Sequence, residues 1–359
     1  RTYNYALNLK GDAPAQGKMD ISVVNIEENA GQVPVNYVLP PGVTRIIDPG
    51  QSQITQLNEQ AMSLKVTDLQ SGDARAVYKN SGMDMRTYKR LQMFVHAEKL
   101  IDDKTNLRDG DVSVFLRLGS DSKSNYYEYE VPLSLTEPGN YSTYNAQDQE
   151  AVWPQSNMFD FPLSLFTDLK LERNAKKRMD NSTVTFQTRY SSYDPDKNQN
   201  KVTIVGNPSL SDVRTMMIGV RNNSNAAKDI VVWVNEMRLT DFDQSGGWAA
   251  KANVNLGLSD IATLNIAGHV ETVGFGGIDQ SLTERRLDDY YQYNIATMVE
   301  LGRFLPEKVK LKAPLFYSIT EQRTSPKYNP LDQDILLKDA LDNAGSKAER
   351  DSISDASIE

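Results

Sequence analysis

Two consecutive hairpins between residues 250 and 319 have strands in which apolar and polar residues alternate over unusually long runs. Strands of ordinary globular proteins usually have about five to six residues. Strands that cross a bilayer in a closed barrel need roughly nine to eleven, which is the length of these runs. The pattern therefore predicts either barrel wall or a large antiparallel sheet with one face in water, and the pattern alone leaves both open.

The first hairpin turns at residues 259–261. Antiparallel pairing about this turn sets Leu256 opposite Leu264 and Val254 opposite Ile266, so that one face is apolar. The other face is polar or small. A slip of one residue would mix the two faces, so the register could slip by two residues but not by one.

The second hairpin is expected to turn across residues 302–308. Val299 then faces Leu311, and Ile295 faces Leu315. In this register Pro314 falls in the middle of a strand. A closed barrel has no free edge at which a missing N–H donor is tolerated, so Pro314 favours the open sheet or requires a bulge.

The barrel interpretation assigns a set of strand residues to lipid, because barrel strands place apolar side chains outward and polar ones inward. These residues are Val254, Leu256, Leu264, Ile266, Ile295, Val299, Leu311 and Leu315.

The rest of the chain predicts an all-β protein. Many short runs with period-2 alternation, bounded by turn residues, are typical of a β-sandwich or jelly roll. One such run is Val184 to Tyr190, and a short helix capped by Asp160 is expected near residues 162–174. We expect four regions: a strand-containing lead-in at 1–60, the sandwich at 61–242, the long hairpins at 243–330, and a short helix with a polar tail at 331–359.

Composition excludes several classes of protein. The net charge is −9 and no basic patch occurs, which argues against nucleic acid as a partner. Without cysteine, disulfides and thiolate metal sites cannot form. No apolar run approaches the roughly 18 residues of a transmembrane helix. Both ends look cut, so the chain is expected to be a fragment of a longer polypeptide.

Weak candidates for metal sites occur in three places, one of which is the acidic loop with Asp102, Asp103, Asp109 and Asp111. Asp194, Asp196 and Asn198 have the oxygen-donor spacing of a calcium loop, although the glycine and the final acid of that loop are missing. A polar turn explains these residues equally well. His96 and Glu98 share a strand face, where half a metal site or a surface ion pair is expected, the latter more often.

Other chemistry has little support. Tyr126, Tyr127, Tyr129 and Trp153 would suit a platform for sugars, but alternation places Tyr127 and Tyr129 in the core and Tyr126 outward. No phosphate loop or nucleophile turn occurs, and no two carboxylates stand out as a glycosidase pair. We therefore expect no catalytic residues, no cofactor and no enzyme activity.

Several short strings occur together and in order along the chain. They are Val38–Val43, Gly72–Lys79, Tyr88–Phe94, Val205–Leu210, Trp233–Leu239, Gly274–Gly276 and Tyr328–Asp332. In this combination the sequence resembles the SprA (also called Sov) family of the Bacteroidetes. The resemblance implies a very large single-chain outer-membrane β-barrel that is the translocon of the type 9 secretion system and serves gliding motility.

The same resemblance implies the partners and the location. The partners are outer-membrane lipid, a PorV-type shuttle protein, a periplasmic plug protein and secreted cargo, and the location is the outer membrane or cell surface. The alternatives are a cell-surface β-sandwich module that recognises glycan or protein, and an enzyme acting on polysaccharide. Folding of residues 243–359 without detergent would favour an alternative over the barrel.

Overall fold

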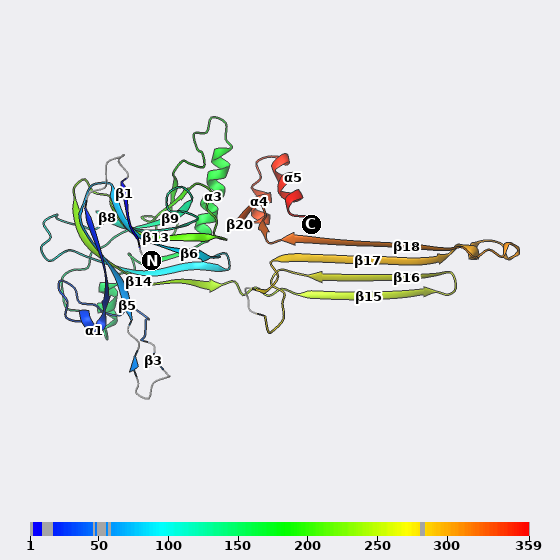
Figure 1. Ribbon diagram of the computed structural model, residues 1–359, viewed down its shortest axis with the longest axis horizontal. Helices are drawn as coiled ribbons and strands as arrows, with labels where there is room; N and C mark the ends of the chain where they lie inside the picture. The colour runs from blue at the N-terminus through cyan, green and yellow to red at the C-terminus, as the bar shows by residue number, and fades with distance from the viewer. Residues whose placement is uncertain are drawn as a thin grey trace. The chain divides into compact units, whose positions relative to one another are not determined.

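The computed structural model describes residues 3–8, 17–45, 47–48, 55–56, 59–280 and 284–358. The rest of the predicted lead-in, including residues 9–16 and 49–54, lies outside this range. The chain divides into two compact units, Arg1–Phe242 and Asp243–Glu359 (Figure 1). Both consist mainly of antiparallel strands, which confirms the predicted all-β class.

The first unit is a sandwich of two antiparallel sheets. The seven-stranded sheet has the order β1 (Tyr3–Asn8), β6 (Asp73–Met83), β13 (Val213–Asn222), β8 (Val112–Gly119), β9 (Tyr126–Pro132), β12 (Lys201–Val205) and β11 (Tyr190–Tyr193). The five-stranded sheet has the order β10 (Phe159–Pro162), β7 (Tyr88–Glu98), β14 (Lys228–Phe242), β5 (Gln60–Leu69) and β2 (Lys18–Asn25). A small separate pair joins β3 (Ile47–Asp48) to β4 (Thr55–Gln56).

Alternation along the strands places the core between the sheets. On β7, Leu91, Met93 and Val95 belong to the main hydrophobic cluster of the unit. The opposite face of β7 is also covered, because Phe94 packs with Trp153 in a second cluster. Both faces of β7 are therefore buried, although apolar and polar residues alternate along the strand.

Three helices accompany the sandwich: α1 (Ile26–Asn29), α2 (Ala146–Val152) and α3 (Ser164–Lys177). The helix predicted near residues 162–174 is α3, but the predicted cap is wrong. Leu163 occupies the N-cap position and makes no side-chain cap bond. Asp160 instead lies in β10, where its carboxylate accepts a hydrogen bond from Arg90 Nε at 2.7 Å.

The strand predicted from Val184 to Tyr190 is wrong as well, since strand structure begins only at Tyr190. The Thr185 and Thr188 hydroxyls bond each other at 3.0 Å, and the Thr188 amide donates to the Thr185 hydroxyl at 3.2 Å. Such local side-chain bonds compete with a strand ladder.

The second unit is built on one four-stranded antiparallel sheet. Its strands are β15 (Ala249–Leu258), β16 (Ala262–Glu271), β17 (Asp288–Glu300) and β18 (Pro314–Pro326), side by side in chain order (Figure 1). The predicted register of the first hairpin is confirmed: Leu256 pairs with Leu264, and Val254 pairs with Ile266.

The predicted register of the second hairpin is wrong by four residues. Val299 pairs with Leu315, and Ile295 pairs with Ile319. The hairpin turns later than expected because residues 301–313 leave the sheet and contain the 3-10 turns η2 (Leu301–Phe304) and η3 (Glu307–Val309). Pro314 therefore opens β18 instead of interrupting it, and the first position of a strand tolerates a missing donor.

The C-terminal segment has more structure than expected. After the pair β19 (Tyr328–Asn329) and β20 (Asp332–Leu336), the predicted short helix is α4 (Leu337–Asp342). A further helix, α5 (Lys347–Ala356), occupies most of the predicted polar tail. Ser346 Oγ accepts from the Glu349 amide at 3.2 Å, an N-terminal capping signal that was readable in the sequence. Among the described residues, no helix has the length and apolar character needed to cross a membrane.

Candidate functional site

The four-stranded sheet has one face made largely of apolar side chains, here called the apolar sheet face. The pairing registers align its residues in rows across the strands. Three successive rows are Val254–Ile266–Ile295–Ile319, Leu256–Leu264–Thr297–Tyr317 and Leu258–Ala262–Val299–Leu315.

The apolar sheet face is open to its surroundings. Val254 is 47% exposed, Leu315 52% and Ile319 39%. Large contiguous apolar patches of this kind are rare on soluble monomers and mark a surface that contacts protein or membrane.

The opposite face of the same sheet is mostly polar or small, apart from Met298 and Phe316, which pair with each other across β17 and β18. Asn255 lies beside Asn265, and Asn294 Nδ2 donates to Thr320 Oγ1 at 2.6 Å. Further along the face, His269 Nε2 lies 3.1 Å from Glu271 Oε1. The sheet therefore separates an apolar side from a hydrogen-bonding side, as the alternation predicted.

Beyond the three apolar rows, the same face carries tyrosines and charged residues. The next two rows on the same face contain Tyr293 beside Glu321 and Tyr291 beside Arg323, and the Tyr293 hydroxyl donates to Glu321. In the register predicted for the second hairpin Tyr317 would lie opposite Tyr293, and the four-residue shift of β18 puts Glu321 there. Amphipathic rings next to charged groups suit the boundary between an apolar layer and water.

The structure brings seven of the eight residues assigned to lipid onto the apolar sheet face. The exception is Leu311, which lies in the loop before β18 and is 53% exposed.

Of the three calcium candidates, Asp194 is buried with other partners, whereas Asp196 and Asn198 are exposed. Asp194 is 2% exposed. Its Oδ2 accepts from the Tyr129 hydroxyl at 2.6 Å, and its Oδ1 accepts from the Asp196 amide at 2.9 Å. Burial and this carboxylate both raise the pKa of Tyr129. In the described part of the chain no three His, Cys, Asp or Glu residues form a group suited to a metal.

His96 and Glu98 do not form the expected surface pair, because the outer face of β7 is covered. Both are buried, with His96 Nε2 3.9 Å from Glu98 Oε2. The His96 ring stacks on Trp233 at 3.9 Å, and its Nδ1 lies 2.8 Å from the Val152 carbonyl oxygen.

The aromatic residues considered for sugar binding are all buried, Tyr126 to 5% exposure and Trp153 to 2%. Tyr126 points away from the core as predicted by alternation, but the Arg117 guanidinium covers its ring at 4.1 Å. No face of these rings is left for a sugar.

A charged cluster that the sequence patterns did not reveal lies on the outer face of the seven-stranded sheet and is here called the arginine–glutamate cluster: Arg117, Glu128, Glu130, Arg189 and Arg221. All of these residues except Arg189 are buried. Arg117 pairs across β8 and β9 with Glu128, and Arg221 reaches both glutamates from β13. Arg117 Nε and Arg189 Nη2 each lie 2.5 Å from Glu128, and Arg221 Nη2 lies 3.0 Å away.

The cluster keeps the Glu128 carboxylate ionised. Burial of Glu128 would raise its pKa, but Arg221, Arg117 and Arg189 together lower it to about 2. Burial also opposes the charge on Arg221, yet Glu128 and Glu130 outweigh it and raise the pKa of that guanidinium. Glu128 and Arg221 thus stabilise each other's charged forms, as buried ions require.

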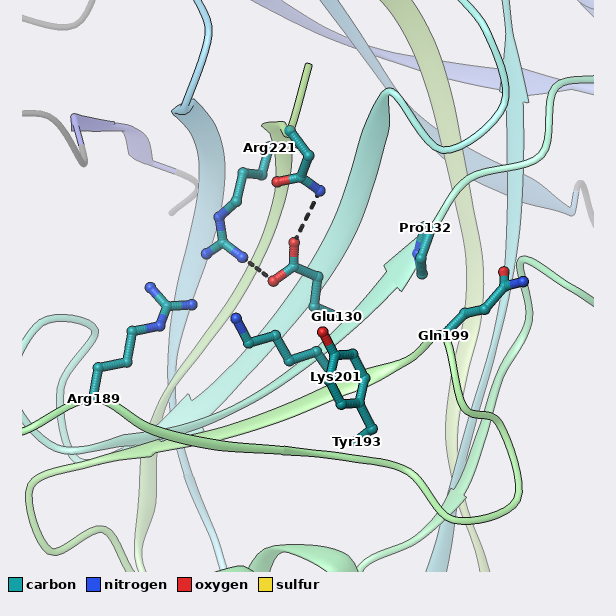
Figure 2. Close-up of a pocket in the computed structure, with 8 residues that line it drawn as sticks. Glu130, Pro132, Arg189, Tyr193, Gln199, Lys201 and Arg221 are labelled. Carbon is teal, nitrogen blue, oxygen red and sulfur yellow. Dashed lines mark hydrogen bonds and ion pairs between the residues drawn. The ribbon is translucent and has the colours of Figure 1, made fainter. Parts of the chain in front are cut away.

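A cleft of about 540 Å³ opens beside this cluster. Figure 2 shows the side chains that line it, with Arg189, Lys201 and Arg221 around Glu130. The remaining lining residues are Pro132, Tyr193, Gln199 and Asn223.

Comparison with known proteins gives one family. The SprA_N family model, described as motility related/secretion protein, matches residues 1–341. A search of curated proteins finds no match. The family match covers nearly the whole chain and agrees with the resemblance read from its sequence strings. This chain belongs to the SprA_N family of motility-related and secretion proteins.

Proposed function

We propose that this chain is part of the translocon pore of the type 9 secretion system in the bacterial outer membrane, which passes folded cargo proteins to the cell surface and supports gliding motility. Strands β15–β18 are a section of the wall of a large β-barrel. The observation that carries the proposal is the exposed apolar sheet face backed by a polar face. Family membership supports the role in secretion.

The strand lengths support the membrane part of the proposal. β15 and β16 each have ten residues. At about 3.4 Å per residue and a tilt of about 45°, such a strand rises roughly 24 Å. The apolar band of an outer-membrane barrel is about 25 Å tall.

The two units have different surroundings in this proposal. Open sheet edges and irregular loops cannot face lipid, so the sandwich of Arg1–Phe242 lies in water. By family resemblance the pore works with a PorV-type shuttle protein, a plug protein and secreted cargo. Its role is conduction without chemical turnover, which agrees with the family description.

Single cysteines test which face meets lipid, since the chain has no cysteine of its own. Ile295→Cys and its neighbour Asn294→Cys form a matched pair, and Val254→Cys with Asn255→Cys repeats the test on another strand. Each variant of the full-length protein is labelled in cells with a water-soluble maleimide. We expect labelling at 294 and 255 and protection at 295 and 254.

Brominated lipid separates membrane from protein burial. A fluorophore attached to the detergent-purified protein at 295 and reconstituted into brominated bilayers is quenched if it contacts lipid. Equal aqueous labelling on both faces, or protection at 295 without quenching, contradicts the proposed wall.

A further inference from the structure

The arginine–glutamate cluster has more positive than negative charge. Its three guanidiniums face two carboxylates, which leaves a net charge of +1. Lys201 also lines the adjoining cleft and brings the local charge to +2. A surplus of this kind in a partly desolvated site attracts an anion.

The carboxylate oxygens of the cluster are already engaged. Glu128 Oε1 accepts from Arg189 and Arg221, and Glu128 Oε2 accepts from Arg117. Glu130 Oε2 accepts from Arg221, and its Oε1 accepts from Ser113 Oγ at 2.5 Å. Within the cluster, no carboxylate oxygen remains without a donor.

Lys201 is therefore left out of the network. It lies directly opposite Glu130 on the neighbouring strand, where the Cβ atoms of paired residues are about 5 Å apart. Even so, its ammonium forms no ion pair within the described residues. Arg189 donates a hydrogen bond from Nη2 to Glu128 Oε1, and 32% of its side chain is exposed.

Neutral donors stand beside these cations. Tyr193 lies opposite Lys201 on the edge strand β11, and Gln199 also lines the cleft. Asn223 lines it too, but its Nδ2 already donates to Ser113 Oγ at 3.0 Å and to Glu130 Oε1 at 3.4 Å. Amide and hydroxyl groups next to Arg and Lys offer several hydrogen bonds to the oxygens of one anion.

We propose that this cleft is a binding site for a small multivalent oxyanion, a polycarboxylate or polyphosphate, held by Lys201 and the free part of Arg189 and oriented by Tyr193 and Gln199. The volume of about 540 Å³ is ample for a molecule of this size. Arg221 lies behind the site and holds Glu130 in place. The site is independent of the proposed pore.

The test is calorimetric titration of the detergent-purified full-length protein with citrate in one arm and pyrophosphate in the other. Binding should weaken as salt rises. Lys201→Gln should reduce affinity roughly tenfold, the typical effect of losing one charge-assisted hydrogen bond. Arg189→Gln should do the same. Lys65→Gln removes an equal charge from an exposed position of the other sheet and should bind like wild type.

Each outcome decides the proposal. Binding of either anion, lost in both cleft variants and kept in Lys65→Gln, supports it, and the stronger arm identifies the ligand as carboxylate or phosphate. No binding at millimolar concentration, or unchanged binding in Lys201→Gln, overturns it. Thermal unfolding of each variant confirms that the fold is retained, since both altered side chains are partly exposed.

Discussion

Individual residues in this chain owe their roles to cross-strand neighbours that the sequence does not reveal. Glu128 and Arg117 occupy polar positions in alternating strands, so sequence alone places them in water. Only the pairing of β8, β9 and β13 brings them together and buries them. For the same reason His96 could not be recognised as a core residue. Sequence predicts which face a residue occupies, but not what covers that face.

Glu128→Gln should destabilise the protein by about 3 kcal/mol, because it leaves buried arginines without their main counterion. The free energy of unfolding, measured by urea denaturation of the sandwich, tests this. Glu150→Gln, at an exposed position, is the control and should change little. A loss below about 1 kcal/mol would show that the cluster is only a weak surface network.

The same carboxylate predicts a pH dependence. The pKa of Glu128 is lowered from 4.5 to about 2 in the folded state. Its ionised form therefore contributes stability that is complete above pH 4.5 and is lost as the pH falls toward 2. We expect the stability difference between wild type and Glu128→Gln to shrink over this window. A difference that stays constant from pH 5 to 2 would contradict the assignment.

At the scale of elements, alternation specified strand faces better than strand ends. The first hairpin was predictable because its three-residue turn is short and a slip of one residue would mix the faces. The second was not, because residues 309–312 alternate apolar and charged side chains like a strand although they lie in the loop before β18. The predicted register was wrong by four residues, but each side chain of β18 still lies on its predicted face, because strand side chains alternate with a period of two. The N-cap of α5, Ser346, can be recognised in the sequence, whereas α3 has no side-chain cap to recognise.

Paired cysteines distinguish the two registers. Val299→Cys with Leu315→Cys places the thiols on directly opposed residues, within reach of a disulfide. Val299→Cys with Leu311→Cys, the pair expected from sequence alone, should not cross-link. Mobility on non-reducing gels after mild oxidation reports the result. Efficient cross-linking of the 299–311 pair would favour the earlier turn.

For the whole molecule, the predicted class and the sandwich followed from strand-length alternation, and family membership followed from ordered strings across many elements. The outer cover of the five-stranded sheet was not predictable. It comes from residues 35–43 and from Trp153, which have no strand pattern of their own. Local periodicity does not show how irregular segments pack against distant parts of the chain, so this cover could not be predicted.

A charge on the apolar sheet face should block assembly of the proposed pore. Ile295→Arg costs about 2–4 kcal/mol at the middle of a bilayer, whereas Asn294→Arg on the polar face adds the same charge in water. We expect the first variant to be depleted from the outer membrane and to secrete less cargo. Membrane fractionation and secretion assays measure both. Equal tolerance of the two variants would contradict lipid contact.

The β15–β18 sheet also bears on how such a structure is built and enlarged. Every strand pairs only with its neighbours in the chain, so each added hairpin completes its bonds locally. Local pairing carries a small loop-closure cost and lets strands join one after another as the chain emerges. Duplication of a hairpin would widen the sheet without disturbing any existing register. A barrel wall built in this way would become wider each time a pair of strands is repeated.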